Sequence, residues 1–120
     1  MTINTHSPIA FTFIRHGGAD IHAELQIWHK KEAYSPNDRP IAKLNFGNAT
    51  QTMELQSINL PKRSFTCVFL GLVRESLNGV YALQLSANDQ ALYTQQGDVN
   101  LTTAPNEFSN LKSVFDLNVT

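Results

Sequence analysis

Charged side chains are scarce in this chain: they make up 16% of its residues, against the roughly one quarter that soluble domains usually carry. Lys and Arg together number 9 and Asp and Glu number 10, so the formal net charge is −1. A surface of this kind has no field that attracts a phosphate backbone. We therefore expect no nucleic-acid partner.

Cysteine is also nearly absent, since Cys67 is the only one. A single cysteine excludes an internal disulfide. It lies within the apolar run Phe65–Val73, where we expect it to be a small buried hydrophobe rather than a reactive thiol.

Long apolar runs are missing as well. None approaches the length of a membrane span, so we expect no transmembrane segment. The start of the chain has no basic stretch followed by an apolar one, so we expect no secretory signal peptide. The default localisation is cytoplasmic, with release by a non-classical route as the open alternative.

Polar uncharged residues take the place of the missing charges, beside an apolar content of 42%. This balance favours a β-rich globular protein over a coiled coil or a disordered chain. The 120 residues predict one domain over 1–120, in which residues 1–7 form a flexible leader.

Residues Ile21–Lys30 carry the clearest pattern in the chain. Ile21, Ala23, Leu25 and Ile27 alternate with His22, Glu24, Gln26 and Trp28. A period of two places these two sets on opposite faces of a strand. The alternative is a helix over 20–34, since the segment is rich in helix formers, but a helix would leave Ala23 and Ile27 off the apolar stripe.

Similar short segments recur about every ten residues, separated by turn signals. They predict an all-β protein: a single-domain antiparallel β-sandwich with jelly-roll or Greek-key connections, eight to nine short strands, and at most one helical turn, at 105–112. Besides Ile21–Lys30, the expected strands are 9–14, 41–46, 49–55, 64–73, 80–87, 91–96, 99–103 and 113–119.

The turn signals predict how these strands connect. Gly17-Gly18 should join the first two as a hairpin, and Gly47-Asn48 should be a further turn. Residues 34–40 are expected to be a loop that crosses between sheets. Asn78-Gly79, Asn88-Asp89 and Gly97-Asp98 should be tight turns. The segment 64–73 should be a central strand that is buried on both faces.

The alternation also predicts the core. The expected buried residues are Phe11, Phe13, Leu25, Ile27, Phe65, Cys67, Phe69, Leu83, Leu85, Phe115, Leu117 and Val119.

Trp28 is the main candidate for a binding residue, because a tryptophan on a polar strand face is unusual. With Gln26, Glu24, His22 and Tyr34 it predicts a ligand-binding patch. Three interpretations are open: the loop 34–40 covers the indole, the indole anchors a protein interface, or it stacks on a sugar.

Arg15-His16-Gly17 follows the strand segment 9–14. This arrangement resembles the phosphohistidine signature of the histidine phosphatase family, in which the histidine attacks phosphorus and the arginine holds phosphate oxygens. The resemblance covers three residues and implies phosphoryl transfer. The alternating strands and helices and the late second histidine of that family have no counterpart here.

Metal ligands are not expected, and neither is a cofactor. His22 and His29 are an odd number of residues apart and point to opposite faces, and no tight metal-ligand spacing occurs. Asp89 and Asp98-Val99-Asn100 offer oxygens on loops that could approach each other around calcium, but Asx turns explain the same residues.

No catalytic motif is present, so we expect no enzyme activity. The sequence favours a non-catalytic binding or assembly module that acts through a surface patch and self-associates, because β edges seek partners unless they are protected. Its partner would be a second copy or another protein. A lectin-like domain that binds a glycan is the alternative, and a phosphoryl-transfer enzyme is the remote one.

Overall fold

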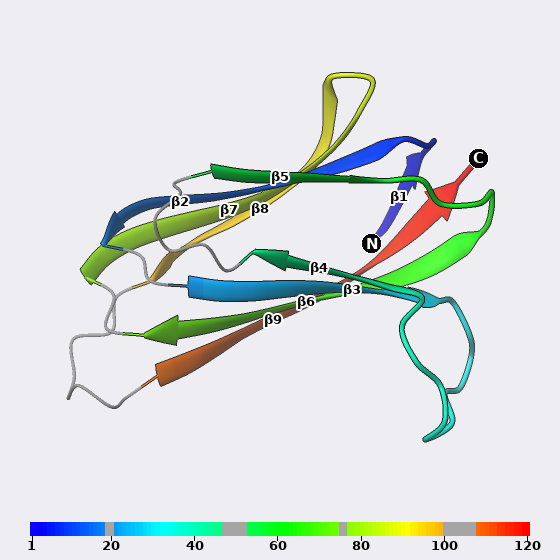
Figure 1. Cartoon of the computed structure of the whole chain (residues 1–120), viewed down its shortest axis with the longest axis horizontal. Helices are drawn as coiled ribbons and strands as arrows, with labels where there is room; N and C mark the ends of the chain where they lie inside the picture. The colour runs from blue at the N-terminus through cyan, green and yellow to red at the C-terminus, as the bar shows by residue number, and fades with distance from the viewer. Residues whose placement is uncertain (19–20, 47–52, 75–76, 100–107) are drawn as a thin grey trace.

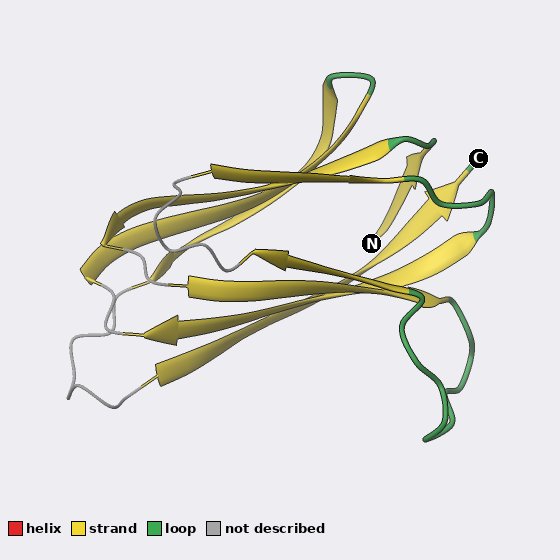
Figure 2. Ribbon diagram, viewed as in Figure 1, coloured by secondary structure: helices red, strands yellow, loops and turns green. Residues whose placement is uncertain are grey.

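A computed structural model describes residues 1–18, 21–46, 53–74, 77–99 and 108–120. The regular elements among these residues are all strands, which form two packed sheets (Figures 1 and 2). The strands are β1 (Thr2–Thr5), β2 (Ile9–Gly18), β3 (Ile21–His29), β4 (Ala42–Phe46), β5 (Met53–Ile58), β6 (Ser64–Arg74), β7 (Leu77–Ala87), β8 (Gln90–Val99) and β9 (Phe108–Val119). The predicted β-sandwich is confirmed.

One sheet has five strands in the order β1-β9-β6-β3-β4, and the other has four in the order β5-β2-β7-β8. All neighbours are antiparallel except β1 and β9, which are parallel. The long strand β6 lies at the centre of the five-stranded sheet, as its apolar sequence predicts.

The hairpin expected between the first two long strands is wrong. β2 pairs with β5 and β7, whereas β3 pairs with β4 and β6, so the chain crosses from one sheet to the other after β2. Each of these strands has an apolar side. Because β2 and β3 lie in opposite sheets, both apolar sides face the core and are buried. The prediction that the loop 34–40 crosses between sheets is also wrong, because this loop joins β3 and β4, which are neighbours in one sheet.

Of the tight turns, Asn88-Asp89 is confirmed, with positive φ values of 50° and 60° that suit a two-residue hairpin. The other two predicted turns are wrong, because Asn78-Gly79 lies in β7 and Gly97-Asp98 lies in β8. Gly97 is opposite Tyr81, and a Cβ at Gly97 would come within 2.9 Å of the Tyr81 ring. This glycine is therefore explained by the packing of a ring against it, not by a turn.

Both ends of the chain also differ from expectation. Thr2–Thr5 form β1, with Ile3 and Thr5 buried, so the flexible leader over 1–7 is wrong for these residues. Phe108 to Lys112 belong to β9, so a helical turn there is wrong as well. Residues 105–107 of that prediction, the turn at Gly47-Asn48 and most of the strand expected at 99–103 lie outside the described residues.

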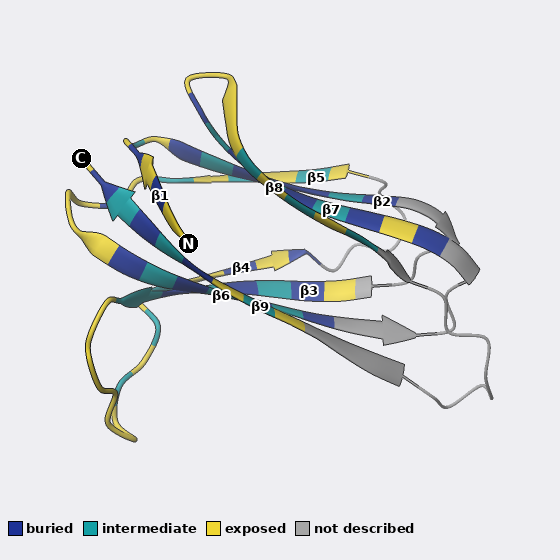
Figure 3. Ribbon diagram, turned by 180° about the vertical axis from the view of Figure 1, so that it is seen from behind, coloured by how far each residue is buried: buried dark blue, intermediate teal, exposed yellow. Residues whose placement is uncertain are grey.

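The core lies between the two sheets, and Figure 3 shows buried residues alternating with exposed ones along the strands. Every predicted core residue is buried. Burial raises the pKa of the Cys67 thiol to about 12, so the thiol is neutral at physiological pH. The core also includes residues that were not predicted: Ile3, Ile9, Ala23, Leu44, Phe46, Leu60 and Tyr81.

Within the described part of the chain, no helix is long and apolar enough to cross a bilayer.

Candidate functional site

The candidate site is a groove on the outer face of the five-stranded sheet. Its floor is formed by Thr66, Val68 and Leu70 of β6, which alternate with the buried Phe65, Cys67 and Phe69. These outward side chains are half-buried rather than fully covered, so the prediction that β6 is buried on both faces is wrong. The continuous apolar run of this strand instead supplies an apolar surface to the outside.

Trp28 stands beside this floor, directly opposite Thr66. Its indole Nε1 donates a hydrogen bond to Gln26 Oε1 at 3.1 Å, and Gln26 Nε2 donates to Glu24 Oε2 at 2.7 Å. The three side chains therefore form a ladder along one face of β3. Because Gln26 satisfies the single indole N–H, the ring face is the part of Trp28 that remains available to a ligand.

The segment 30–41 between β3 and β4 forms a wall beside the indole. The Tyr34 ring meets the Trp28 ring edge-on, with centroids 5.7 Å apart and planes at 78°. Tyr34 Oη donates to the His29 carbonyl at 2.8 Å, which fixes the phenol. The loop thus lies against one side of Trp28 and leaves it half-buried instead of enclosed.

The conformation of this loop depends on Asp38. Its carboxylate accepts hydrogen bonds from Lys31 Nζ at 2.7 Å and from the Ser35 backbone N–H at 2.6 Å. The Lys31 bond, followed by that of Ser35, holds the pKa of Asp38 below its ordinary value of 3.8. Arg39 Nη1 donates to the carbonyls of Pro36 and Asp38, both at 2.9 Å.

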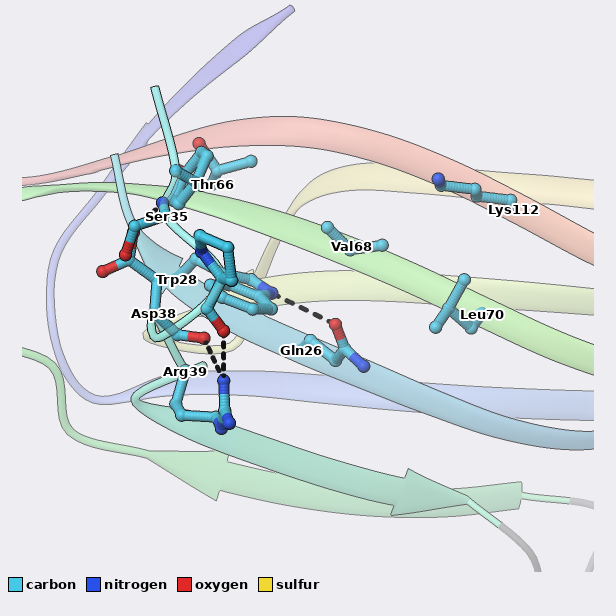
Figure 4. Close-up of a pocket in the computed structure, with 11 residues that line it drawn as sticks. Gln26, Trp28, Ser35, Asp38, Arg39, Thr66, Val68, Leu70 and Lys112 are labelled. Carbon is cyan, nitrogen blue, oxygen red and sulfur yellow. Dashed lines mark hydrogen bonds between the residues drawn. The ribbon is translucent and has the colours of Figure 1, made fainter. Parts of the chain in front are cut away.

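The groove between this wall and the sheet has a volume of about 540 Å³. Figure 4 shows Trp28 and Arg39 near one end and Lys112 of β9 toward the other. Lys112 lies opposite Leu70, four residues along β6 from Thr66. At about 3.3 Å per residue, the floor is roughly 13 Å long.

The charges around the groove are unequal. Asp38 is occupied by Lys31 and Ser35, whereas Arg39 uses one nitrogen of a guanidinium that carries five N–H donors. Among the described residues, Lys112 has no ion-pair partner. The charged groups still available to a ligand along the groove are therefore the cations Arg39 and Lys112.

The predicted site residues lie on this face in part. Trp28, Gln26 and Tyr34 line the groove, Glu24 supports Gln26 from beside it, and His22 is an exposed residue farther along the same face of β3. The other lining residues come from distant segments and are not predicted by the sequence: Ser35, Pro36, Asp38, Arg39, Thr66, Val68, Leu70 and Lys112. A signal for the floor was present, since β6 remains apolar at both alternating positions.

The phosphatase-like motif has a different setting from the one the resemblance implies. Arg15, His16 and Gly17 are part of β2 and do not form a turn. Arg15 is 5% exposed, donates to Glu54 at 2.7 Å and has its guanidinium carbon 5.6 Å from the centre of the Phe13 ring. An arginine in that position faces the protein interior, where a phosphate would have to displace Glu54.

The alternative of a calcium site shared by these loops is contradicted by the positions of Asp89 and Asp98. Asp89 precedes β8 and Asp98 lies near its far end, so the strand holds them roughly 30 Å apart. Asn100 lies outside the described residues. The described part of the chain contains no group of three or more His, Cys, Asp and Glu side chains that could hold a metal.

Comparisons of the chain with protein-family models, with curated proteins and with solved structures find no match.

Proposed function

We propose that the protein is a non-catalytic binding module whose ligand is an extended segment of a partner protein lying in the Trp28 groove. The observation that carries this proposal is the half-buried indole, which Gln26 and Tyr34 hold beside an apolar floor. Trp, Tyr and Arg are the residues enriched among those that dominate the energetics of protein interfaces. Trp and Tyr contribute large contact areas with little loss of rotamer freedom.

The two available cations suggest the chemistry of the segment. An apolar side chain would cover Val68 and Leu70, and an acidic residue would lie within reach of Arg39 or Lys112. Since the floor is roughly 13 Å long, it accommodates about four residues of an extended chain. The proposed ligand is thus a short acidic peptide with an apolar anchor.

A carbohydrate is the second candidate, favoured by the position of amide and carboxylate groups beside an aromatic ring. Gln26 and Glu24 are bonded to each other and to the indole, which reduces what they can offer to sugar hydroxyls. Val68 and Leu70 offer such hydroxyls no partner. These two features favour the peptide over the sugar.

The test uses arrayed peptides that combine an apolar residue with Asp or Glu, next to counterparts in which Asn or Gln replaces the acid. We expect acidic peptides to bind and to lose affinity with added salt, because exposed charges are screened. Titration can be followed by the fluorescence of Trp28, the only tryptophan. Equal binding of the acidic and amide peptides would contradict the proposal, and binding to a glycan array alone would favour the lectin.

A matched pair of variants separates the groove from the overall charge. Lys112→Glu and Lys62→Glu change the net charge equally, and Lys62 is exposed in the connection between β5 and β6, outside the groove. We expect only Lys112→Glu to weaken binding of acidic peptides. If both variants weaken it to the same extent, the attraction is non-specific.

A further inference from the structure

The four edge strands of the two sheets differ in how they are protected from pairing with other chains. β1 has only 4 residues, β4 carries the exposed Lys43, and β8 contains a bulge where its pairing with β7 shifts at Leu85 and Ser86. Short length, an outward lysine and a bulge are all known to discourage edge-to-edge pairing.

β5 has none of these protections within Met53–Ile58. It pairs with β2 in an unbroken register, and it contains no lysine or proline. Its single charged side chain, Glu54, is directed toward the core. An inward charge can itself discourage edge pairing, but here Arg15 already compensates it within the monomer. The edge of the four-stranded sheet is therefore a regular strand without an outward charge.

The outward side chains of β5 are strongly apolar. Met53 is 61% exposed and Leu55 is 62% exposed, more than any other large apolar side chain of the described residues except Met1. Ser57, the next outward residue, begins a row of small side chains, because it lies opposite Ala10, which in turn lies opposite Ser86. A hollow of about 330 Å³ lies over this row, beside Leu55 and the Asn88-Asp89 turn.

A projecting methionine and a hollow at the two ends of one strand are complementary under a two-fold axis. If β5 of one copy pairs antiparallel with β5 of a second copy and Leu55 lies opposite Leu55, then Met53 lies opposite Ser57 of the partner. Each Met53 side chain can then extend over Ser57 toward the hollow of the other copy. An isologous dimer of this kind satisfies both ends of the strand at once.

We propose that the protein forms a homodimer through β5, in which two four-stranded sheets join into one continuous sheet with Leu55 on the two-fold axis. Alternative registers are less favourable: centring on Glu54 places two carboxylates opposite each other, and centring on Gln56 separates the leucines. Pairing over β5 is roughly 20 Å long. An interface of this length is modest, so the dimer should dissociate on dilution.

Sedimentation velocity of the full chain over about three decades of concentration tests the association. We expect a monomer–dimer equilibrium that Leu55→Lys shifts to monomer. Val114→Lys is the matched control, since Val114 is 55% exposed on a strand of the other sheet and should not alter the equilibrium. A protein that stays monomeric at all concentrations overturns the proposal, as does a dimer that Val114→Lys disrupts and Leu55→Lys does not.

Disulfide trapping tests the register independently of affinity. Residues directly opposite in an antiparallel pair have Cβ atoms about 5 Å apart, so Leu55→Cys should cross-link with itself under mild oxidation. Ser57→Cys should not cross-link alone but should do so when mixed with Met53→Cys. The unmodified protein serves as background, because Cys67 is buried. Self-cross-linking of Ser57→Cys in place of Leu55→Cys would overturn the register.

Discussion

The outer faces of the two sheets are both hollowed, but by different means. On the five-stranded sheet the loop 30–41 adds a wall beside Trp28 and brings Arg39 to the groove. On the four-stranded sheet the hollow results from small side chains at Ala10, Ser57 and Ser86, with apolar residues beside it. The first surface combines an aromatic ring, an apolar floor and cations, whereas the second combines shape with an unprotected edge.

This difference indicates what each face suits. A groove with available cations is complementary to a ligand of negative charge. A second copy of this chain, with a net charge of only −1, would supply little of that charge. A surface that carries both a hollow and an apolar projection can be complementary to the same surface on a second copy. The two faces are therefore proposed to bind different partners, and they should respond to mutation independently.

The largest effect on stability is expected from two ion pairs that differ in how far they are buried. Arg15–Glu54 is buried, with side chains 5% and 11% exposed, whereas Lys30–Asp116 is open to solvent at 48% and 28%. Glu54→Gln removes the carboxylate that pairs with this buried guanidinium and should lower the free energy of unfolding by about 3 kcal/mol. Asp116→Asn should lower it by less than about 1 kcal/mol.

Urea denaturation of the two variants measures this contrast. Because Glu54 also anchors the edge strand β5 to β2, its replacement should weaken the dimer in sedimentation as well. Equal loss of stability in both variants would show that the two pairs are solvated alike.

The next largest effect concerns the independence of the two faces. Trp28→Ala should weaken binding of an acidic peptide by about 2 kcal/mol, or roughly 30-fold in Kd, as removal of a central aromatic contact usually does. The same variant should leave the monomer–dimer equilibrium unchanged, and Leu55→Lys should do the reverse. Calorimetry measures the peptide affinity of each variant, and sedimentation measures its monomer–dimer equilibrium. A variant that alters both the affinity and the equilibrium would mean that the faces are coupled.

The smallest effect is a pH dependence confined to the groove. The pKa of Asp38 is depressed by Lys31 and Ser35, so the ionised carboxylate stabilises the loop above its ordinary pKa of 3.8. That contribution is lost as the pH falls through the lower folded-state pKa. We therefore expect quenching of Trp28 fluorescence by acrylamide to increase below pH 3.8.

Asp38→Asn provides the control for this transition. The variant should show the more open groove already at neutral pH and no Asp38-dependent change on acidification, while its dimerisation remains as in the unmodified protein. A transition of equal size in Asp38→Asn would assign the effect to another group, such as Asp116, whose pKa Lys30 also lowers.

Much of the fold could be predicted because a period of two is a local property. The alternation in 21–30 identified β3 and its buried face. The core residues that the same pattern predicts in the other strands are all buried as well. Turn residues were less informative. Asn88-Asp89 does form a turn, but Gly97 is required by the Tyr81 ring and not by a reversal of the chain, which the local sequence does not distinguish.

The candidate site was predictable only where it follows a single strand. Trp28, Gln26 and Glu24 occupy alternate positions of β3, so their ladder follows from the sequence. Lys112 is 84 positions from Trp28 in the chain and reaches the groove only because β9 pairs with β6. No local pattern records that pairing.

The sequence by itself thus determined that the chain forms strands, which side of each strand is buried and which aromatic stands on a polar face. The tertiary structure decided which strands are neighbours, that β2 and β3 belong to opposite sheets, that the loop 30–41 builds a wall, and that β5 is an edge. The physical reason is that side-chain alternation is imposed within one strand by backbone geometry, whereas neighbours are chosen by contacts between segments far apart in the chain.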